Sequence, residues 1–379
     1  MATITGVGIV VPLLPVYARS MGAGGLYIGL IFGAFSISRS VLLPFFGRWS
    51  DRSGRKPFIV IGLFCYFLSS VAFILFTHVF QLIVIRFFQG MASAMIMPVV
   101  QAYVGDITPR GREGFVMGLF NMSLFFGLSL GPVIGGFIND HISMQAAFGC
   151  MGTLALVGAA LSLWFLPVTR NEVGLRSGSG RLPVRWKAIA GDRVIIGLFA
   201  FRLVYTSGIG IIWGFLPILA DAELHLNSSR IGVLVMLGVL VSGIIQTPMG
   251  YLADRFSPKA MVLVGGMSAG LAILAYYWAV SFSQLVACSI AFGLGGGTAM
   301  PAVMAVAVLK GNQTKAMGSV MSLLTVAHSL GMLVGAVLAG LMMDWYNLRA
   351  AFGLGAAWLL VGVIVFYASV RGVDIDGGK

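Results

Sequence analysis

Long apolar runs, separated by short segments that contain charged residues, glycine and proline, make up most of this chain. A helix needs roughly twenty apolar residues to cross the hydrocarbon core of a bilayer. The chain divides at its charged and turn-forming segments into twelve such runs, namely Met1 to Ala18, Tyr27 to Phe46, Phe58 to Thr77, Val79 to Tyr103, Phe115 to Ile138, Met144 to Pro167, Val194 to Leu219, Ile231 to Leu252, Ala260 to Val280, Gln284 to Leu309, Ala316 to Met343 and Ala351 to Val370. The pattern predicts an all-α integral membrane protein with twelve transmembrane helices.

The composition leads to the same class of protein. Of the 379 residues, 59% are hydrophobic and 9% are charged, which is more apolar area than a water-soluble domain can hide. The net charge of +12 is explained by basic residues that orient membrane loops, so we expect no nucleic-acid partner. Cys65, Cys150 and Cys288 lie inside apolar runs and predict small buried side chains without a disulfide or a metal. We expect no cofactor.

The distribution of lysine and arginine predicts the orientation. With both termini in the cytoplasm, most basic residues fall in cytoplasmic segments, and the outer loops contain only Arg19, Arg230 and Arg349. The first run lacks a basic leader and a small-residue cleavage site, so we interpret it as a span and not as a signal peptide. The short loops and tails are typical of a bacterial protein. The expected location is the bacterial inner membrane, with multiple passes.

Repeated residues divide the chain into two similar halves. Met97-Pro98 recurs as Met300-Pro301, and the pattern of Gly47, Asp51 and Arg52 recurs as Gly250, Asp254 and Arg255. The segment 169–192 is rich in arginine, glycine and serine and is typical of a linker. We therefore predict a six-helix bundle over 1–168, a cytoplasmic linker over 169–192 and a second six-helix bundle over 193–379. Two such repeats are expected where a central site is exposed alternately to either side.

Three motifs carry a family resemblance. They are Gly47-x-x-x-Asp51-Arg52-x-Gly54-Arg55-Lys56, Arg86-Phe87-Phe88-Gln89-Gly90, and the spaced series Gly118, Gly127, Gly131-Pro132 and Gly135-Gly136. Together they resemble the signatures of the major facilitator superfamily, and the third is similar to the motif of its drug:proton antiporter branch. The resemblance implies a transporter and not an enzyme: a monomer in the lipid bilayer that exports a small-molecule substrate in exchange for protons.

The same resemblance implies two gating elements. Asp51 is expected to latch against the start of the eleventh span and against Arg110 or Arg112, which holds the cytoplasmic side shut in the outward-facing state. The glycines of the fifth span are expected to seal a pliable seam between the halves, although ordinary small-residue packing makes the same contact. The residues predicted to act in gating are Gly47, Asp51, Arg52, Gly54, Arg55, Arg110, Arg112, Gly127, Gly131, Pro132, Gly135, Asp254 and Arg255. For the basic members, orientation of the loop beside anionic lipid is an equally good interpretation.

Charged residues inside spans are expensive and usually face a cavity or a partner. Arg39, Arg86 and Arg202 lie within spans, whereas every acidic residue falls in a loop, in the tail or at a span end. The central cavity should therefore be neutral to positive. Either the cargo is anionic or zwitterionic with arginine as its counter-ion, or the arginines are structural and the cargo is neutral. The predicted substrate-binding residues are Arg39, Arg86, Arg202, Gln89, Asn121, Tyr205, Trp213 and Gln246.

Proton coupling follows from the resemblance, and the residues offer two candidates for it. His328, in the eleventh span, is the one obvious group that could titrate near neutral pH, with a local hydrogen bond as the alternative interpretation. Asp106 lies at the end of the fourth span, where capping or pairing with Arg110 is the alternative. Two rival functions stay open. One is an uptake or facilitative carrier for a small metabolite or organic anion. The other is a catalytic or sensory membrane protein, for which the chain offers no recognisable catalytic grouping.

Overall fold

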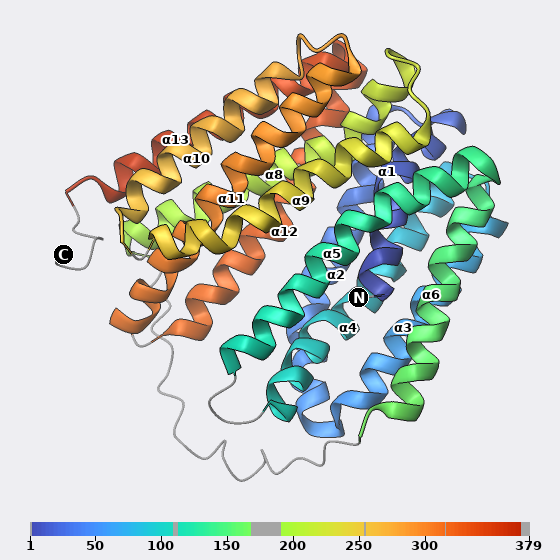
Figure 1. Ribbon diagram of the computed structural model, residues 1–379, viewed down its shortest axis with the longest axis horizontal. Helices are drawn as coiled ribbons and strands as arrows, with labels where there is room; N and C mark the ends of the chain where they lie inside the picture. Colours follow the sequence, from blue (N-terminus) through green and yellow to red (C-terminus); the bar gives the residue numbers. More distant parts are fainter. Residues whose placement is uncertain (1, 109–112, 168–190, 254, 315, 373–379) are drawn as a thin grey trace. The chain divides into compact units, whose positions relative to one another are not determined.

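The computed structural model describes residues 2–108, 113–167, 191–253, 255–314 and 316–372, and this part of the chain is built from α-helices without a strand (Figure 1). The helices are α1 (Ala2–Ser20), α2 (Gly25–Ser53), α3 (Arg55–Leu75), α4 (Val79–Ile107), α5 (Glu113–His141), α6 (Met144–Phe165), α8 (Arg193–Ala222), α9 (Ser228–Ala253), α10 (Pro258–Ala275), α11 (Phe282–Gln313), α12 (Met317–Trp345) and α13 (Leu348–Val370). Eleven are long and apolar enough to cross a membrane, and α1 contains the shorter apolar stretch Ile4–Ser20. The predicted all-α membrane fold is confirmed.

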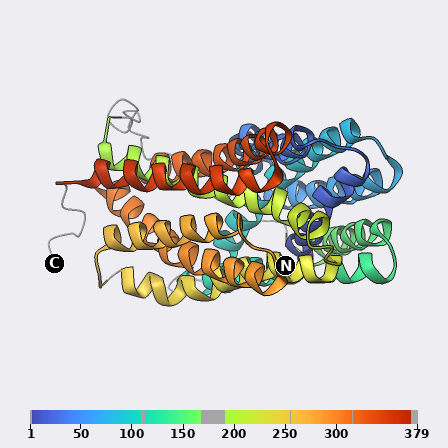
Figure 2. The ribbon, with the colours of Figure 1, turned by 90° about the horizontal axis from the view of Figure 1, so that it is seen from above.

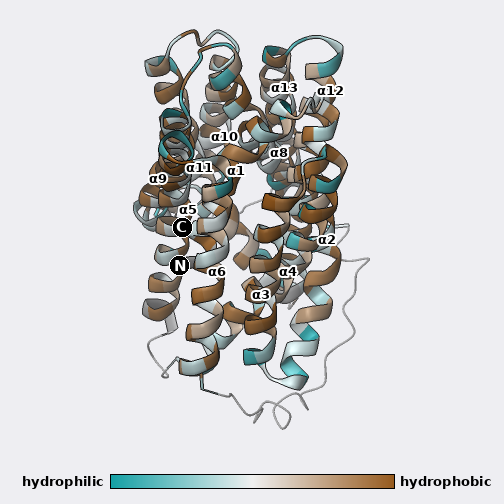
Figure 3. Ribbon diagram, turned by 90° about the vertical axis from the view of Figure 1, so that its right-hand side faces the viewer, coloured by the Kyte–Doolittle hydropathy of each residue, from teal (hydrophilic) through white to brown (hydrophobic). Residues whose placement is uncertain are grey.

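Large apolar side chains cover much of the outside of the helices. Phe80, Trp164, Phe165 and Ile364 are each at least 65% exposed. Figure 3 shows hydrophobic residues along the length of the helices and hydrophilic ones mainly near the helix ends. In water such a surface would aggregate, whereas in a bilayer it replaces lipid–lipid contacts. This exposed apolar surface is therefore the surface that we expect to face lipid, which is why the chain needs so few charged residues.

The first compact unit comprises Met1–Ala23, Leu30–Arg181 and Asn227–Met236. In it, α1 packs against α5 and α6, and α3 packs against α4 and α6. Small residues allow α1 and α5 to approach closely, because a Cβ on Gly135 would come within 2.7 Å of the carbonyl oxygen of Ile9. The core between α3 and α4 is formed by large side chains, including Tyr66 and Met95.

The second compact unit comprises Gly24–Gly29, Leu182–Leu226 and Leu237–Lys379. Its centre is α8, which packs against α12 and α13, while α10 packs against α11 and α13. Figure 2 shows α13 and α8 side by side. Gly331 and Gly335 of α12 lie on the backbone of α8 at Leu203 and Ser207. The glycine contact of α12 with α8 thus resembles the contact of α5 with α1.

Two helices belong to both units. The first turn of α2 clusters with the second unit, and the rest of that helix lies in the first. The beginning of α9 clusters with the first unit, and its remainder lies in the second. The division into bundles over 1–168 and 193–379 stays a prediction.

The sequence places the end of the second span too early. We expected the span to end at Phe46, but α2 continues to Ser53, so that Gly47, Asp51 and Arg52 are helical. The chain reverses only at Gly54, which has a φ of 91° that other residues rarely adopt. Arginine is a good helix former, so charge ends the apolar run without ending the helix. Gly47 makes no close helix contact, since a Cβ there would meet nothing within 4 Å.

Candidate transport site and gating residues

The first buried arginine of the candidate site is Arg86, on α4. It is 4% exposed, and its Nη1 donates a hydrogen bond of 2.8 Å to Oε1 of Gln89, one helical turn further on. The guanidinium lies over the ring of Phe35 at 4.5 Å and over that of Phe32 at 5.3 Å, both on α2. Aromatic faces stabilise a desolvated cation but supply no negative charge. The structure brings the predicted pair Arg86 and Gln89 together and leaves the arginine without a carboxylate among the described residues.

A tyrosine that the sequence analysis did not single out connects Arg86 with Arg39. Tyr66 of α3 is 2% exposed, hydrogen-bonds to Ser93 and interacts electrostatically with both arginines. Nε of Arg39 and Nε of Arg86 are both buried without a hydrogen-bond partner in the described part of the chain. The first unit therefore holds one buried arginine, Arg86, and one partly buried arginine, Arg39, each with at least one donor unused among the described residues.

The second unit contains a separate cationic cluster around Arg202 of α8. Its Nη2 faces Nδ1 of His328 on α12 at 3.4 Å, and its Nη1 donates to the thioether sulfur of Met300 on α11. Its Nε is buried and has no hydrogen-bond partner within the described segments. An arginine has only donors, so Nδ1 of His328 must present its lone pair to the guanidinium. The predicted cargo residue and the predicted proton carrier are thus direct neighbours.

The other predicted substrate-binding residues lie in different surroundings. Tyr205 is 4% exposed and stacks on Phe292 with 5.6 Å between ring centroids, so it is part of the aromatic core of the second unit. Trp213 and Gln246 are partly buried, whereas Asn121 is exposed. Contact of these residues with cargo stays a prediction.

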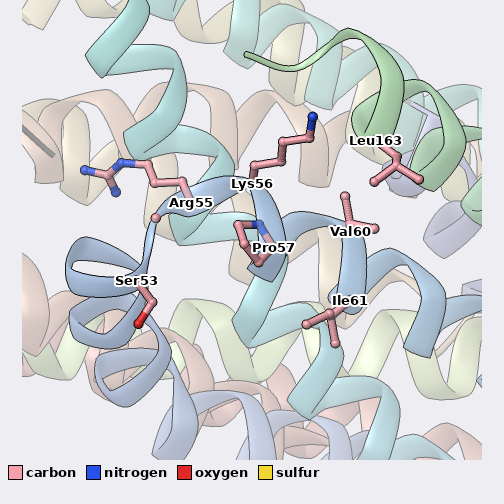
Figure 4. Close-up of a pocket in the computed structure, with 8 residues that line it drawn as sticks. Ser53, Arg55, Lys56, Pro57, Val60, Ile61 and Leu163 are labelled. Carbon is pink, nitrogen blue, oxygen red and sulfur yellow. The ribbon is translucent and has the colours of Figure 1, made fainter. Parts of the chain in front are cut away.

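Arg55 joins the ends of three helices in the first unit. It forms an ion pair of 3.2 Å with Asp51 at the end of α2 and a second ion pair with Asp106 in the last turn of α4. Figure 4 shows the side chain of Arg55 pointing away from those of Lys56, Val60 and Leu163. These residues line a hollow of about 280 Å³. Asp106 therefore pairs with Arg55. The latch partners Arg110 and Arg112, residues 169–190 of the predicted linker 169–192, and Asp254 lie outside the described residues.

The glycines of α5 make two kinds of contact. Gly131 and Gly135 lie against α1 at Thr5, Gly8 and Ile9, inside the first unit. Gly118 faces open space, because a Cβ at this position would meet nothing within 4 Å. Gly127 is buried. Two members of the predicted seam therefore serve as the packing surface for α1, and the gating role of the series stays a prediction.

Membrane-length helices arranged as two repeats, each unit with an arginine whose Nε is buried, define a polytopic membrane transport protein. The model of the Major Facilitator Superfamily matches residues 1–209 and again 202–375. The chain belongs to this family, and it is a secondary transporter and not an enzyme.

Similar proteins include proteins named for drug resistance and transporters of other kinds. The chain is 29% identical to multidrug resistance protein 2 of Bacillus subtilis, over 94% of this chain and 90% of the relative. It is 30% identical to the quinolone resistance protein NorA of Staphylococcus aureus, over 53% of this chain and 54% of the relative. Among solved structures, a bacterial homologue of the human lysosomal transporter Spinster, inward-facing and occupied, has a TM-score of 0.81 at 13% identity, covering 99% of this chain and 96% of that one. The nucleoside transporter NupG has a TM-score of 0.80 at 12% identity, with coverage of 98% and 97%.

Proposed function

We propose that this protein exports small amphipathic compounds by alternating access, in exchange for protons. It acts as a monomer in a bacterial inner membrane with both termini in the cytoplasm. Relatives named for multidrug and quinolone resistance support export. The excess of lysine and arginine in the predicted cytoplasmic segments supports the orientation.

The proposed cargo carries an acidic group, and Arg202 is the observation on which this rests. A guanidinium has five donors, and those of Arg202 meet a thioether sulfur and an imidazole nitrogen at 3.4 Å, while Nε has no partner among the described residues. The thioether is a weak acceptor, the contact with the imidazole is long, and neither group is charged. A carboxylate or similar anion would accept two parallel hydrogen bonds and neutralise the buried charge.

The proposed proton carrier is His328. Protonation at Nδ1 would remove the acceptor that faces Arg202 and would place a second positive charge beside the guanidinium. The contact between Arg202 and His328 would then have to break. The protonation state of His328 and the position of Arg202 are therefore linked, which is what coupling of a proton to cargo requires.

Ligand screening in detergent tests the proposed cargo class. Aryl carboxylates of increasing size would each be compared with the primary amide of the same ring system, and the melting temperature of the protein would be measured. We expect acids to raise the melting temperature of the wild type more than their amides do, and Arg202→Gln to remove this difference. Arg349→Gln is the control, because Arg349 pairs with Glu223 and with a backbone carbonyl oxygen at a helix end. Equal stabilisation by acids and amides would favour a neutral cargo, with structural arginines.

A further inference from the structure

The first turn of α9 is held by an acidic side chain at the end of α5. The two oxygens of Asp140 accept hydrogen bonds from the backbone N–H groups of Ser228, at 2.9 Å, and Ser229, at 2.8 Å. The hydroxyl of Ser229 donates a third, at 2.6 Å, and Asn139 adds a bond of 2.7 Å to the hydroxyl of Ser228. The first N–H groups of a helix lack intrahelical partners and carry partial positive charge, so a carboxylate is well suited to this position.

The first turn of α2 is held in the same way by α12. The oxygens of Asp344 accept hydrogen bonds from the backbone N–H groups of Gly25, at 2.6 Å, and Leu26, at 2.8 Å. In both cases each carboxylate oxygen takes one of two consecutive N–H groups. A neutral amide side chain has a single acceptor oxygen and cannot reproduce this geometry.

A glycine one turn before each carboxylate allows the backbones to touch. Gly136 lies on the carbonyl oxygen of Ser228, and Gly340 lies on that of Gly25, so closely that a Cβ at either position would overlap the oxygen. The starting helices contribute glycines of their own, with Gly232 on the backbone of Pro132 and Gly29 on that of Ala336. Each contact is therefore a tight, sterically specific seat for the start of one helix.

The contact of Asp140 with the start of α9 and that of Asp344 with the start of α2 have the same geometry in the two halves of the chain. Each acid follows its glycine by four residues, and α5 and α12 are the helices that pack in equivalent ways on α1 and α8. The helices that are held, α2 and α9, each begin in one compact unit and continue along the chain into the other. A rearrangement between the units must therefore either bend each helix just after its first turn or release that turn from its carboxylate.

We propose that Asp140 and Asp344 are the two parts of an outer latch, which must release the first turns of α9 and α2 before the transport site opens to the outside. The inference rests on the proposed function for the orientation and for alternating access. It adds a charged gate on the predicted outer face, made of residues outside the family motifs quoted above.

Distances between spin labels in lipid nanodiscs test the outer latch. Cys65, Cys150 and Cys288 are first replaced by serine. Label pairs at Tyr27 and Tyr346, and at Ile142 and Arg230, which are all exposed, then report on α2 with α12 and on α5 with α9. Asp140→Asn should lengthen the distance between the labels at Ile142 and Arg230. Asp344→Asn should lengthen the distance between those at Tyr27 and Tyr346, and the double variant should lengthen both distances. For each lost carboxylate we expect the ratio of open to closed populations to rise roughly three- to tenfold.

Asp221→Asn is the matched control, because Asp221 is an acid at the end of α8 with no hydrogen bond or ion pair found in the described portion of the chain. Unchanged distances in the double variant would overturn the latch, and so would an equal shift in the control. Melting temperatures identify any variant that fails to fold. If Asp140→Asn fails to fold, Asp140→Ser, whose hydroxyl oxygen is still a hydrogen-bond acceptor, replaces it. A wild type that transports no cargo while the labels shift would overturn the proposed function and leave the latch in place.

Discussion

Arg202 faces Nδ1 of His328 across 3.4 Å, and this contact requires that the imidazole carry no proton at that nitrogen. The pair consists of the arginine that we propose to bind an acidic cargo and the histidine that we propose to carry the proton. Both residues lie in the second unit, on α8 and α12, the helices whose packing forms its largest interface.

Replacing His328 should remove transport that is driven by a proton gradient and should preserve the exchange of cargo across the membrane. We expect His328→Ala to abolish transport driven by a pH gradient in proteoliposomes but to leave counterflow, because cargo binding by Arg202 does not need the ring. The control is His225→Asn, an exposed residue with a φ of 49° that asparagine tolerates. Driven transport that persists in His328→Ala would rule out this proton carrier.

The ion pairs of Arg55 give a different expectation for Asp106. Its carboxylate is 30% exposed and shares Arg55 with Asp51, so the pairing should stabilise the helix ends modestly. We expect Asp106→Asn to lower stability by at most about 1 kcal/mol and to leave gradient-driven transport intact. Thermal unfolding checks the change in stability, and uptake into proteoliposomes checks gradient-driven transport. A variant that loses driven transport but retains counterflow would instead make Asp106 the proton carrier.

The glycines of α5 should differ in their tolerance of alanine. At Gly131 a Cβ would overlap the backbone of Thr5 and Gly8, and we expect Gly131→Ala to cost about 2 kcal/mol of stability. Gly118, in the same helix, has nothing within 4 Å, so Gly118→Ala should be neutral or slightly stabilising through helix propensity. Melting temperatures of the two variants in one detergent provide the comparison. Equal effects would contradict the close packing of α5 on α1.

The hydrophobic pattern was sufficient to predict the fold but not the helix ends. The length of an apolar run reflects the thickness of the hydrocarbon core of the bilayer, so twelve spans could be predicted from such runs. The backbone hydrogen bonds of a helix continue past that depth, so α2 reaches Ser53 although its apolar run ends at Phe46.

The arginines of the candidate site could be predicted because charge inside a span is rare. Their neighbours could not. Tyr66 and Met300 are common residue types in membrane helices, and they come from other helices than the arginines that they contact. Asp140 and Asp344 did carry a weak signal, since each stands four residues after a glycine, Gly136 or Gly340, near the end of its span. A carboxylate at a span end is otherwise ordinary, and only the backbone N–H groups that it meets distinguish it.

The most direct test of the account is transport of an acid and its amide in inside-out vesicles. A radiolabelled aryl carboxylate that stabilises the purified protein, and the matching amide, would be offered with and without a pH gradient that is acidic inside. We predict accumulation of the acid that depends on the gradient, roughly tenfold weaker accumulation in Arg202→Gln because a charged hydrogen-bonded pair is lost, and no such loss in Arg349→Gln. Accumulation of the amide to the same level, or of the acid equally well in Arg202→Gln, would contradict an exporter that recognises acidic cargo through Arg202.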